Sequence, residues 1–454
     1  MLIGVAGLGL VLLTVGPVAA HGVGGRTDLP IPFWQFAWAA TLAVVASFLA
    51  LGRFWPEPRM KEAAGGRVLP GRIQDSARVL LPLTGLAGLT MFGVVLFAAL
   101  RGSTVITSNI APYAFFIVFW VGLQLVSTLI GDVWAVFDPF RTLADLGARA
   151  RTLVTGRPLS DPSQGAGNRW WAVGAILSFV WLELAYHRGA EPRTVGVYLV
   201  IYSSAMLCGA AWRGRGWVRD ADGFGVLFSV LAAMAPLYRD NSGKLRLRKP
   251  LAGLAELEVT PATARFVLVV LGSTTFDGFS RSSFWLDIVS NRSGWELTAL
   301  NTGGLVFGIG VVMFVYRTAI SAMSRITDES EVELGDAFTP SLVPIVLAYS
   351  VAHYFSFLVL DGQAVIRLVS DPFGMGWNLF GTAGYGVNYT LLTPSAIAWI
   401  QTAAIAAGHV LAVVVAHDRA VERFPRQLAV RSQYPMLVAM IAYTVGGLFL
   451  LLGG

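Results

Sequence analysis

Apolar residues fall along the chain in long runs separated by short polar segments, a pattern unlike the alternation seen in half-buried strands. A helix needs about 20 mostly apolar residues to cross the hydrocarbon core of a bilayer. Several of the runs begin or end with Trp, Tyr or Phe, as positions at a membrane interface do. The pattern predicts ten transmembrane helices, near residues 33–52, 79–100, 110–131, 170–187, 194–212, 264–280, 300–316, 342–360, 394–416 and 435–452.

The composition supports this interpretation. Of 454 residues, 55% are hydrophobic and 13% are charged, against roughly 25% charged residues in soluble domains. The excess of 33 basic over 27 acidic residues lies in short loops, where it indicates topology rather than nucleic-acid binding. The single cysteine, Cys208, excludes an internal disulfide. The sequence therefore predicts an all-α polytopic membrane protein whose surroundings are the lipid bilayer, with no nucleic-acid partner.

The N-terminal segment has the features of a signal peptide. Residues 2–15 are apolar, and Val18 and Ala20 fit the small-residue rule for cleavage after Ala20. The alternative is an uncleaved N-terminal anchor, and in either case residues 21–454 form one helical membrane domain. Only Lys61, Lys244 and Lys249 are lysines, a bias typical of high-GC bacterial genomes. We therefore expect a bacterial plasma-membrane protein.

One apolar segment, residues 223–237, decides the sidedness of the second half of the chain. It has only about 15 residues, too few to cross a bilayer. The Arg-rich loop 53–78 is cytoplasmic by the positive-inside rule. If 223–237 does not cross, the basic stretches 239–249 and 417–431 are also inside, and the 361–393 loop, nearly free of Lys and Arg, is outside. The sequence thus predicts a re-entrant or interfacial half-helix at 223–237, and an extracytoplasmic mature N-terminus.

Ionisable side chains at membrane depth are costly and are therefore functional candidates. With the predicted topology, three histidines and three carboxylates share the outer side of the membrane. These residues are His21, Glu183, His187, Asp277, His353 and Asp361.

This outer group suggests a metal site. Glu183 and His187 are four residues apart, so a continuous helix would place them on one face, where a single ion could take a ligand from each. Imidazole and carboxylate ligands suit zinc or copper. We expect Glu183, His187 and His353 as ligands and Asp277 as general base or fourth ligand. A new N-terminal His21 could also chelate copper through its amine and its ring. Each residue alone also fits a structural role at a helix end or in a bundle.

A second group lies at the predicted inner side. His409 and His417 are about 80° apart around a helix, which is poor for a shared metal but suits a proton or ligand path. Asp132 ends the third predicted span at the same depth. The alternative is that these residues are ordinary charged helix ends.

Four stretches resemble a family of bacterial multi-pass membrane proteins labelled fenitrothion hydrolase. They are residues 21–32, 275–280, 352–357 and 408–419, and the likeness extends over most of the chain. The resemblance implies hydrolysis of an organophosphorus ester. Because the family has no defined catalytic motif, no residue role is carried over from it.

Three functions remain open at this point. The first is a metal-dependent hydrolase that acts on a small molecule at the outer leaflet. The second is a secondary transporter or permease, in which Asp277, Glu183 and Asp132 bind the substrate or the coupling ion. The third is a subunit of a larger membrane complex. The sequence predicts no oligomeric state.

Overall fold

The computed structural model describes residues 32–156, 169–214 and 216–452, and this part of the chain is almost entirely helical. The predictions about His21 and about a signal peptide or anchor at residues 1–20 therefore concern residues outside this described part. The α-helices are α1 (Phe33–Phe54), α2 (Met60–Ala64), α3 (Gly71–Arg101), α4 (Ile110–Pro112), α5 (Leu123–Leu129), α6 (Trp134–Phe137), α7 (Pro139–Thr155), α8 (Trp170–Leu184), α9 (Pro192–Arg213), α10 (Gly216–Ala221), α11 (Gly223–Ala232), α12 (Pro261–Phe279), α13 (Ser283–Val289), α14 (Gly294–Thr327), α15 (Glu331–Phe338), α16 (Val343–Val359), α17 (Ala364–Leu368), α18 (Pro394–Arg423), α19 (Arg426–Ser432) and α20 (Tyr434–Leu452).

Shorter elements connect these helices. A π-helix, η2 (Tyr113–Gly122), connects α4 to α5. The remaining elements are the 3₁₀ turns η1 (Ile106–Ser108), η3 (Ala252–Glu256), η4 (Thr339–Leu342) and η5 (Asp361–Gln363), and the strands β1 (Arg67–Val68), β2 (Leu237–Arg239) and β3 (Leu245–Leu247).

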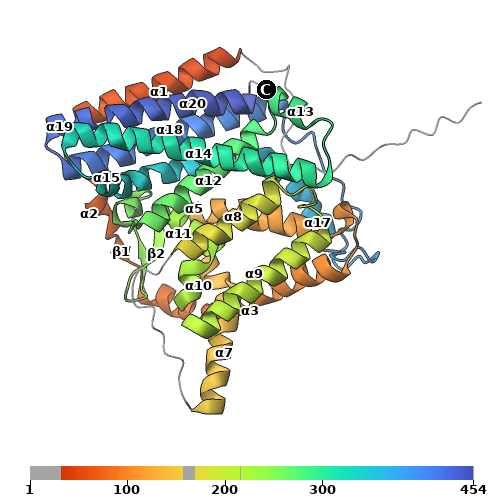
Figure 1. Cartoon of the computed structure of the whole chain (residues 1–454). Helices are drawn as coiled ribbons and strands as arrows, with labels where there is room; N and C mark the ends of the chain where they lie inside the picture. Colours follow the sequence, from red (N-terminus) through yellow and green to blue (C-terminus); the bar gives the residue numbers. More distant parts are fainter. Residues whose placement is uncertain (1–31, 157–168, 215, 453–454) are drawn as a thin grey trace, which may run out of the picture.

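The predicted all-α membrane architecture is confirmed. Within the described residues, eight helical segments are long and apolar enough to cross a membrane. The other two predicted spans, α8 and α12, are also helices. However, α8 has only 15 residues, and α12 carries Arg265 and Asp277 within its length. Helices α1, α14, α18 and α20 lie side by side in the bundle, as Figure 1 shows.

A small sheet fixes which loops share a side of the bundle. Its strand order is β1-β3-β2, and Arg67 pairs with Leu247. The segment after α1 and the segment after α11 therefore lie on the same side, which we call the sheet side. Asp418 in α18 also belongs to this side, because its carboxylate accepts a hydrogen bond from the backbone N–H of Arg59 at 2.7 Å. The opposite side, the far side, contains the 102–110 and 361–393 segments, which are joined by the hydrogen bond from Ser103 N to the Phe373 carbonyl at 2.8 Å.

The half-helix expected at 223–237 is present as α11. It has 10 residues and is about 15 Å long, half the thickness of a bilayer core. Most of its side chains are buried within the bundle, so it is not a surface-lying helix. Asp222 caps it, and the same carboxylate accepts hydrogen bonds from the Tyr202 hydroxyl at 2.6 Å and the Trp134 indole at 2.9 Å. The chain then returns to the sheet side through β2.

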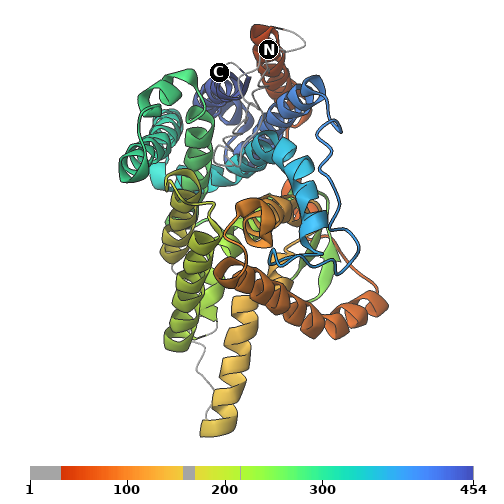
Figure 2. The ribbon, with the colours of Figure 1, turned by 90° about the vertical axis from the view of Figure 1, so that its right-hand side faces the viewer.

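Helix α7 projects from the bundle in both views (Figures 1 and 2). The sequence predicts an amphipathic helix here, started by the Asp138-Pro139 pair. Asp138 is indeed its N-cap and accepts hydrogen bonds from Phe140 N and Arg141 N. Its last turns expose apolar and basic side chains together, as helices that lie along a membrane surface do.

Close helix crossings depend on glycine, as at Gly272 in α12. A Cβ built there would overlap the backbone of Ile309 in α14. We expect Gly272→Val to destabilise the protein by about 2 kcal/mol, because overpacking a close crossing forces the helices apart. The measurement is the thermal unfolding midpoint in detergent. Gly310→Val is the matched control, since nothing lies within 4 Å of its built Cβ. Equal midpoints for the two variants would contradict the prediction.

Candidate functional site

Five side chains form a buried polar cluster near the far side of the bundle. Glu183 is one residue before the end of α8, and Asp277 is two residues before the end of α12. His353 and Tyr354 lie in α16, about 9 Å from its end. Arg281 is two residues beyond the end of α12. We call these five residues, which three helices bring together, the polar cluster.

Asp277 and His353 form the tightest contact of the polar cluster. Asp277 Oδ2 lies 2.6 Å from His353 Nε2, and both side chains are almost completely buried. The Arg281 guanidinium approaches the same pair, with Nη2 at 2.8 Å from His353 Nε2 and 3.4 Å from Asp277 Oδ1. A guanidinium only donates hydrogen bonds. His353 Nε2 therefore faces the Arg281 guanidinium, which needs an acceptor, and the Asp277 carboxylate, which accepts a hydrogen bond when it is ionised.

Tyr354 joins the two carboxylates. Its hydroxyl oxygen lies 3.0 Å from Glu183 Oε1 and 2.9 Å from Asp277 Oδ2. A hydroxyl has one proton to donate, so it can satisfy one carboxylate and must accept from the other. Within the described residues, the second oxygen of Glu183, Oε2, is buried and has no hydrogen-bond partner. Ionised carboxylates in such a position are strongly disfavoured.

The net charge of the polar cluster and the hydrogen bonding of Tyr354 can both be balanced by one added proton. With both carboxylates ionised and the imidazole neutral, Glu183, Asp277 and Arg281 together carry one net negative charge. One added proton on the chain from Glu183 through Tyr354 and Asp277 to His353 removes that charge. The same proton gives the Tyr354 hydroxyl a donor on its second side. One added proton would thus both balance the charges of these three residues and complete the hydrogen bonding of Tyr354.

The polar cluster does not fit the zinc or copper ion expected from the sequence. In the described residues, no three His, Cys, Asp or Glu side chains are placed to hold a metal ion together. The two atoms best suited to bind a metal ion, His353 Nε2 and Asp277 Oδ2, already contact each other. The positive guanidinium of Arg281, 2.8 Å from the nitrogen, lies where a cation would have to bind.

The prediction that Glu183 and His187 share a helical face is wrong. Helix α8 ends at Leu184, and the chain turns away through residues 185–189. His187 instead packs against Trp295, and its Nδ1 lies 2.8 Å from the Thr298 hydroxyl of α14. The i,i+4 rule applies only while the helix continues, and here it stops one residue after Glu183.

The remaining predicted residues lie apart from the polar cluster. Asp361 begins η5 on the far side, and partial burial raises its pKa above the ordinary aspartate value, while a hydrogen bond from Tyr389 opposes this. Asp132 follows α5 and accepts a hydrogen bond from Ala135 N. Burial raises the pKa of Asp132.

The two histidines of α18 do not share a site. His409 donates from Nδ1 to the Ile405 carbonyl one turn earlier, at 2.8 Å. His417 donates from Nε2 to the Trp55 carbonyl at 3.0 Å, and its Nδ1 faces the Gln433 amide at 3.2 Å. His417 therefore ties α18 to the segment after α1 and to α19, as an ordinary helix-end residue would.

Two members of the polar cluster were missed from sequence. Tyr354 directly follows His353, and Arg281 lies four residues after Asp277. The second spacing is a recognisable signal, since i,i+4 acid–base pairs face each other on a helix. No spacing rule identifies Tyr354, because its partner Glu183 is 171 residues away.

Comparison with known proteins adds no family assignment. No family model, no curated protein and no solved structure gives a significant match to the chain.

Proposed function

We propose that this protein is a proton-coupled secondary transporter and that the polar cluster is its proton-binding site. The observation that carries the proposal is the hydrogen-bonded chain from Glu183 through Tyr354 and Asp277 to His353, with the Arg281 guanidinium beside it. This chain is one proton short when both acids are ionised. Ionisable groups inside membrane bundles commonly serve as proton relays.

The positions of these residues explain how a proton could bias the conformation. Glu183, Asp277 and the His353–Tyr354 pair belong to three different helices, α8, α12 and α16. Adding or removing the proton changes the charge balance that joins their ends. In alternating access, groups of helices rearrange around a binding site. A ligand, here a proton, shifts such an equilibrium by its differential affinity for the two states.

The proposal is tested by proton movement in proteoliposomes. The protein is reconstituted with an internal pH dye, and a panel of organic anions, amino acids, sugars and amphiphilic solutes is added outside. We expect at least one solute to change the internal pH, and Asp277→Asn to reduce the initial rate by at least about tenfold. Asn keeps the side-chain shape but cannot exchange a proton.

The matched control is Asp287→Asn, in the exposed far-side helix α13. It should transport at the wild-type rate. If no solute moves protons, or if Asp277→Asn retains full coupled flux, the transporter proposal is overturned. Glu183→Gln is a second variant. It removes the proton site at the other end of the chain and should give the same loss.

A second candidate function, hydrolysis, is supported by the His353–Asp277 pair. A carboxylate that orients an imidazole is the arrangement of many general bases. In this case His353 would activate water toward an organophosphorus ester, without the metal ion expected from sequence. Release of nitrophenol from a nitrophenyl phosphorothioate ester, lost in His353→Gln but without any solute-dependent proton flux, would favour this function over transport.

A further inference from the structure

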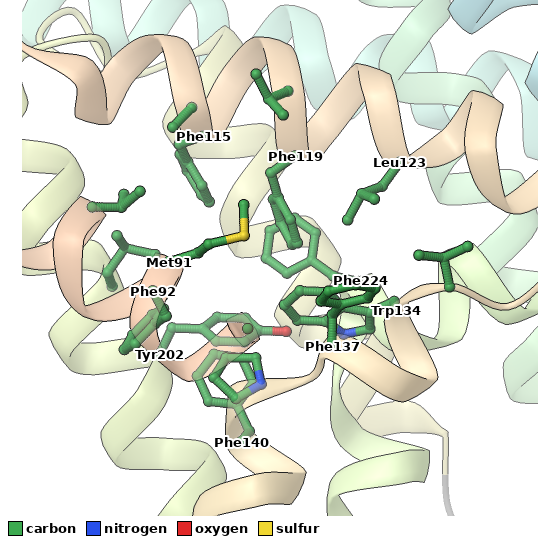
Figure 3. A pocket seen from close by; sticks show the side chains of 17 residues that line it. Met91, Phe92, Phe115, Phe119, Leu123, Trp134, Phe137, Phe140, Tyr202 and Phe224 are labelled. Atoms are coloured by element: carbon green, nitrogen blue, oxygen red, sulfur yellow. The ribbon is translucent and has the colours of Figure 1, made fainter. Parts of the chain in front are cut away.

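An apolar cavity lies apart from the polar cluster. It has a volume of about 380 Å³ and is lined by residues of α3, η2, α5, α6, α7, α9 and α11 (Figure 3). This volume is within the usual range of small-ligand pockets, about 300–1,000 Å³. Large aromatic side chains surround it, among them Phe92, Phe119, Phe140 and Phe224.

The lining offers a ligand no hydrogen bond. Among the residues that line the cavity, only Tyr202 and Trp134 carry polar side-chain atoms. Both already donate to Asp222, the Tyr202 hydroxyl at 2.6 Å and the Trp134 indole at 2.9 Å. A polar solute would lose its hydration without compensation. The cavity therefore selects a hydrocarbon.

The cavity can be reached from the bilayer. Met91 of α3 and Val118 of η2 line it, yet they are 59% and 40% exposed at the protein surface. Helix α3 is a membrane-spanning segment of which only 11% is buried inside the protein. The exposed surface around Met91 thus faces lipid hydrocarbon, and the entrance opens sideways into the membrane.

The wall between the cavity and the bundle centre is the π-helix η2. Ten consecutive residues form it, whereas π-helices are usually single-turn bulges found at functional sites. Ala114, Phe115, Val118 and Phe119 of η2 line the cavity. This short segment therefore directs four apolar side chains into the same space.

We infer that this cavity binds one acyl chain of a membrane phospholipid. The lining accepts only hydrocarbon, and the entrance faces the compartment where phospholipid tails are the solvent, so mass action favours them over rarer apolar molecules. Pro139 and Phe140, at the start of α7, form one edge of the cavity. Arg141 follows them, and Arg149 and Arg151 lie exposed further along α7, where they can attract the phosphate headgroup.

The test uses a phospholipid with a photoactivatable diazirine on its acyl chain, incorporated into nanodiscs with the full chain. Crosslinked residues are mapped by mass spectrometry. We expect the 88–95 and 114–123 segments to be labelled about tenfold more than Phe307 and Phe314, which face lipid on α14 outside the cavity. Val118→Trp fills the cavity and should reduce this labelling about tenfold.

Val311→Trp is the matched control, because Val311 is 38% exposed on α14 and does not line the cavity. It should leave the labelling unchanged. Ala114→Phe fills the cavity from another position and should reduce the labelling in the same way. Each variant is checked for correct folding by a monodisperse peak on size-exclusion chromatography.

Three outcomes overturn the inference. The first is equal labelling of the cavity and of α14. The second is equal loss in Val118→Trp and Val311→Trp. The third is displacement of the phospholipid probe by a photoactivatable free fatty acid, which would identify a different occupant. None of these outcomes bears on proton transport by the polar cluster, so the two proposals fail separately.

Discussion

Replacing Asp418 with leucine should destabilise the protein by about 4 kcal/mol, because three buried or half-buried donors lose their acceptor together. Asp418 Oδ1 accepts from the Trp55 indole at 2.9 Å and from Arg59 N at 2.7 Å. The N–H of Met60 points at the same carboxylate, 3.3 Å from Oδ2. This one side chain, which is itself buried, therefore caps the start of α2 and attaches the segment after α1 to α18.

The expected result is a lower unfolding midpoint in detergent together with faster hydrogen exchange at the Arg59 and Met60 amides. Asp418→Asn is the informative comparison. It keeps one acceptor oxygen for the Trp55 and Arg59 donors and loses the charge and the second oxygen, which faces Met60 N, so its cost should be about 1–2 kcal/mol. If the leucine and asparagine variants unfold at the same midpoint, the hydrogen bonds do not hold this connection, and packing around α18 does.

Hydropathy was sufficient to predict the all-α membrane architecture. It is a local property, because a single apolar run of bilayer length indicates a span. The sidedness inferred from loop charge stays a prediction. The short length of 223–237 predicted α11, and the pairing of β1 with β3 places the segment after α11 beside the segment after α1. The three-stranded sheet itself was not predicted, since its strands have only two or three residues each.

The polar cluster was only partly predictable. Sidedness brought Glu183, Asp277 and His353 together in the prediction, and the structure places all three in the polar cluster. The inclusion of His187 assumed that α8 continues. The chain instead turns at Gly189, whose N–H bonds back to the Tyr186 carbonyl, and a Cβ on Gly189 would overlap the Leu182 carbonyl. Local sequence rarely determines helix ends to within two or three residues, and here that margin decides which residue joins the site.

The choice of Tyr354 and Arg281 as partners depends on packing between helices distant in sequence. A hydropathy pattern says which residues are buried but not which of them meet. The metal-site hypothesis followed from residue types, the spacing of Glu183 and His187, and the predicted sidedness. It did not anticipate that a guanidinium would occupy the space beside His353. The position of Arg281, which was not predicted, therefore decides whether the polar cluster can accept a cation.

Replacing Arg281 with methionine should have an effect of similar size, a loss of about 3–5 kcal/mol, because removing the cation of a buried ion pair leaves the charge of its carboxylate partner poorly compensated. Arg281 is the guanidinium of the polar cluster and lies 3.4 Å from Asp277. The loss should be larger at pH 8 than at pH 5, since at low pH a bound proton can replace the missing positive charge. The measurement is the unfolding midpoint at both pH values.

Two comparisons make this result specific to the charge. Arg265→Met changes an exposed arginine on the same helix, α12, and should cost no more than about 0.5 kcal/mol. The double variant Asp277→Asn/Arg281→Met removes both charges and should recover more than half of the loss, because the uncompensated carboxylate is gone. If the two single losses simply add, Arg281 does not balance Asp277. The proposal that the polar cluster holds one exchangeable proton would then be wrong, and proton coupling would lose its physical basis.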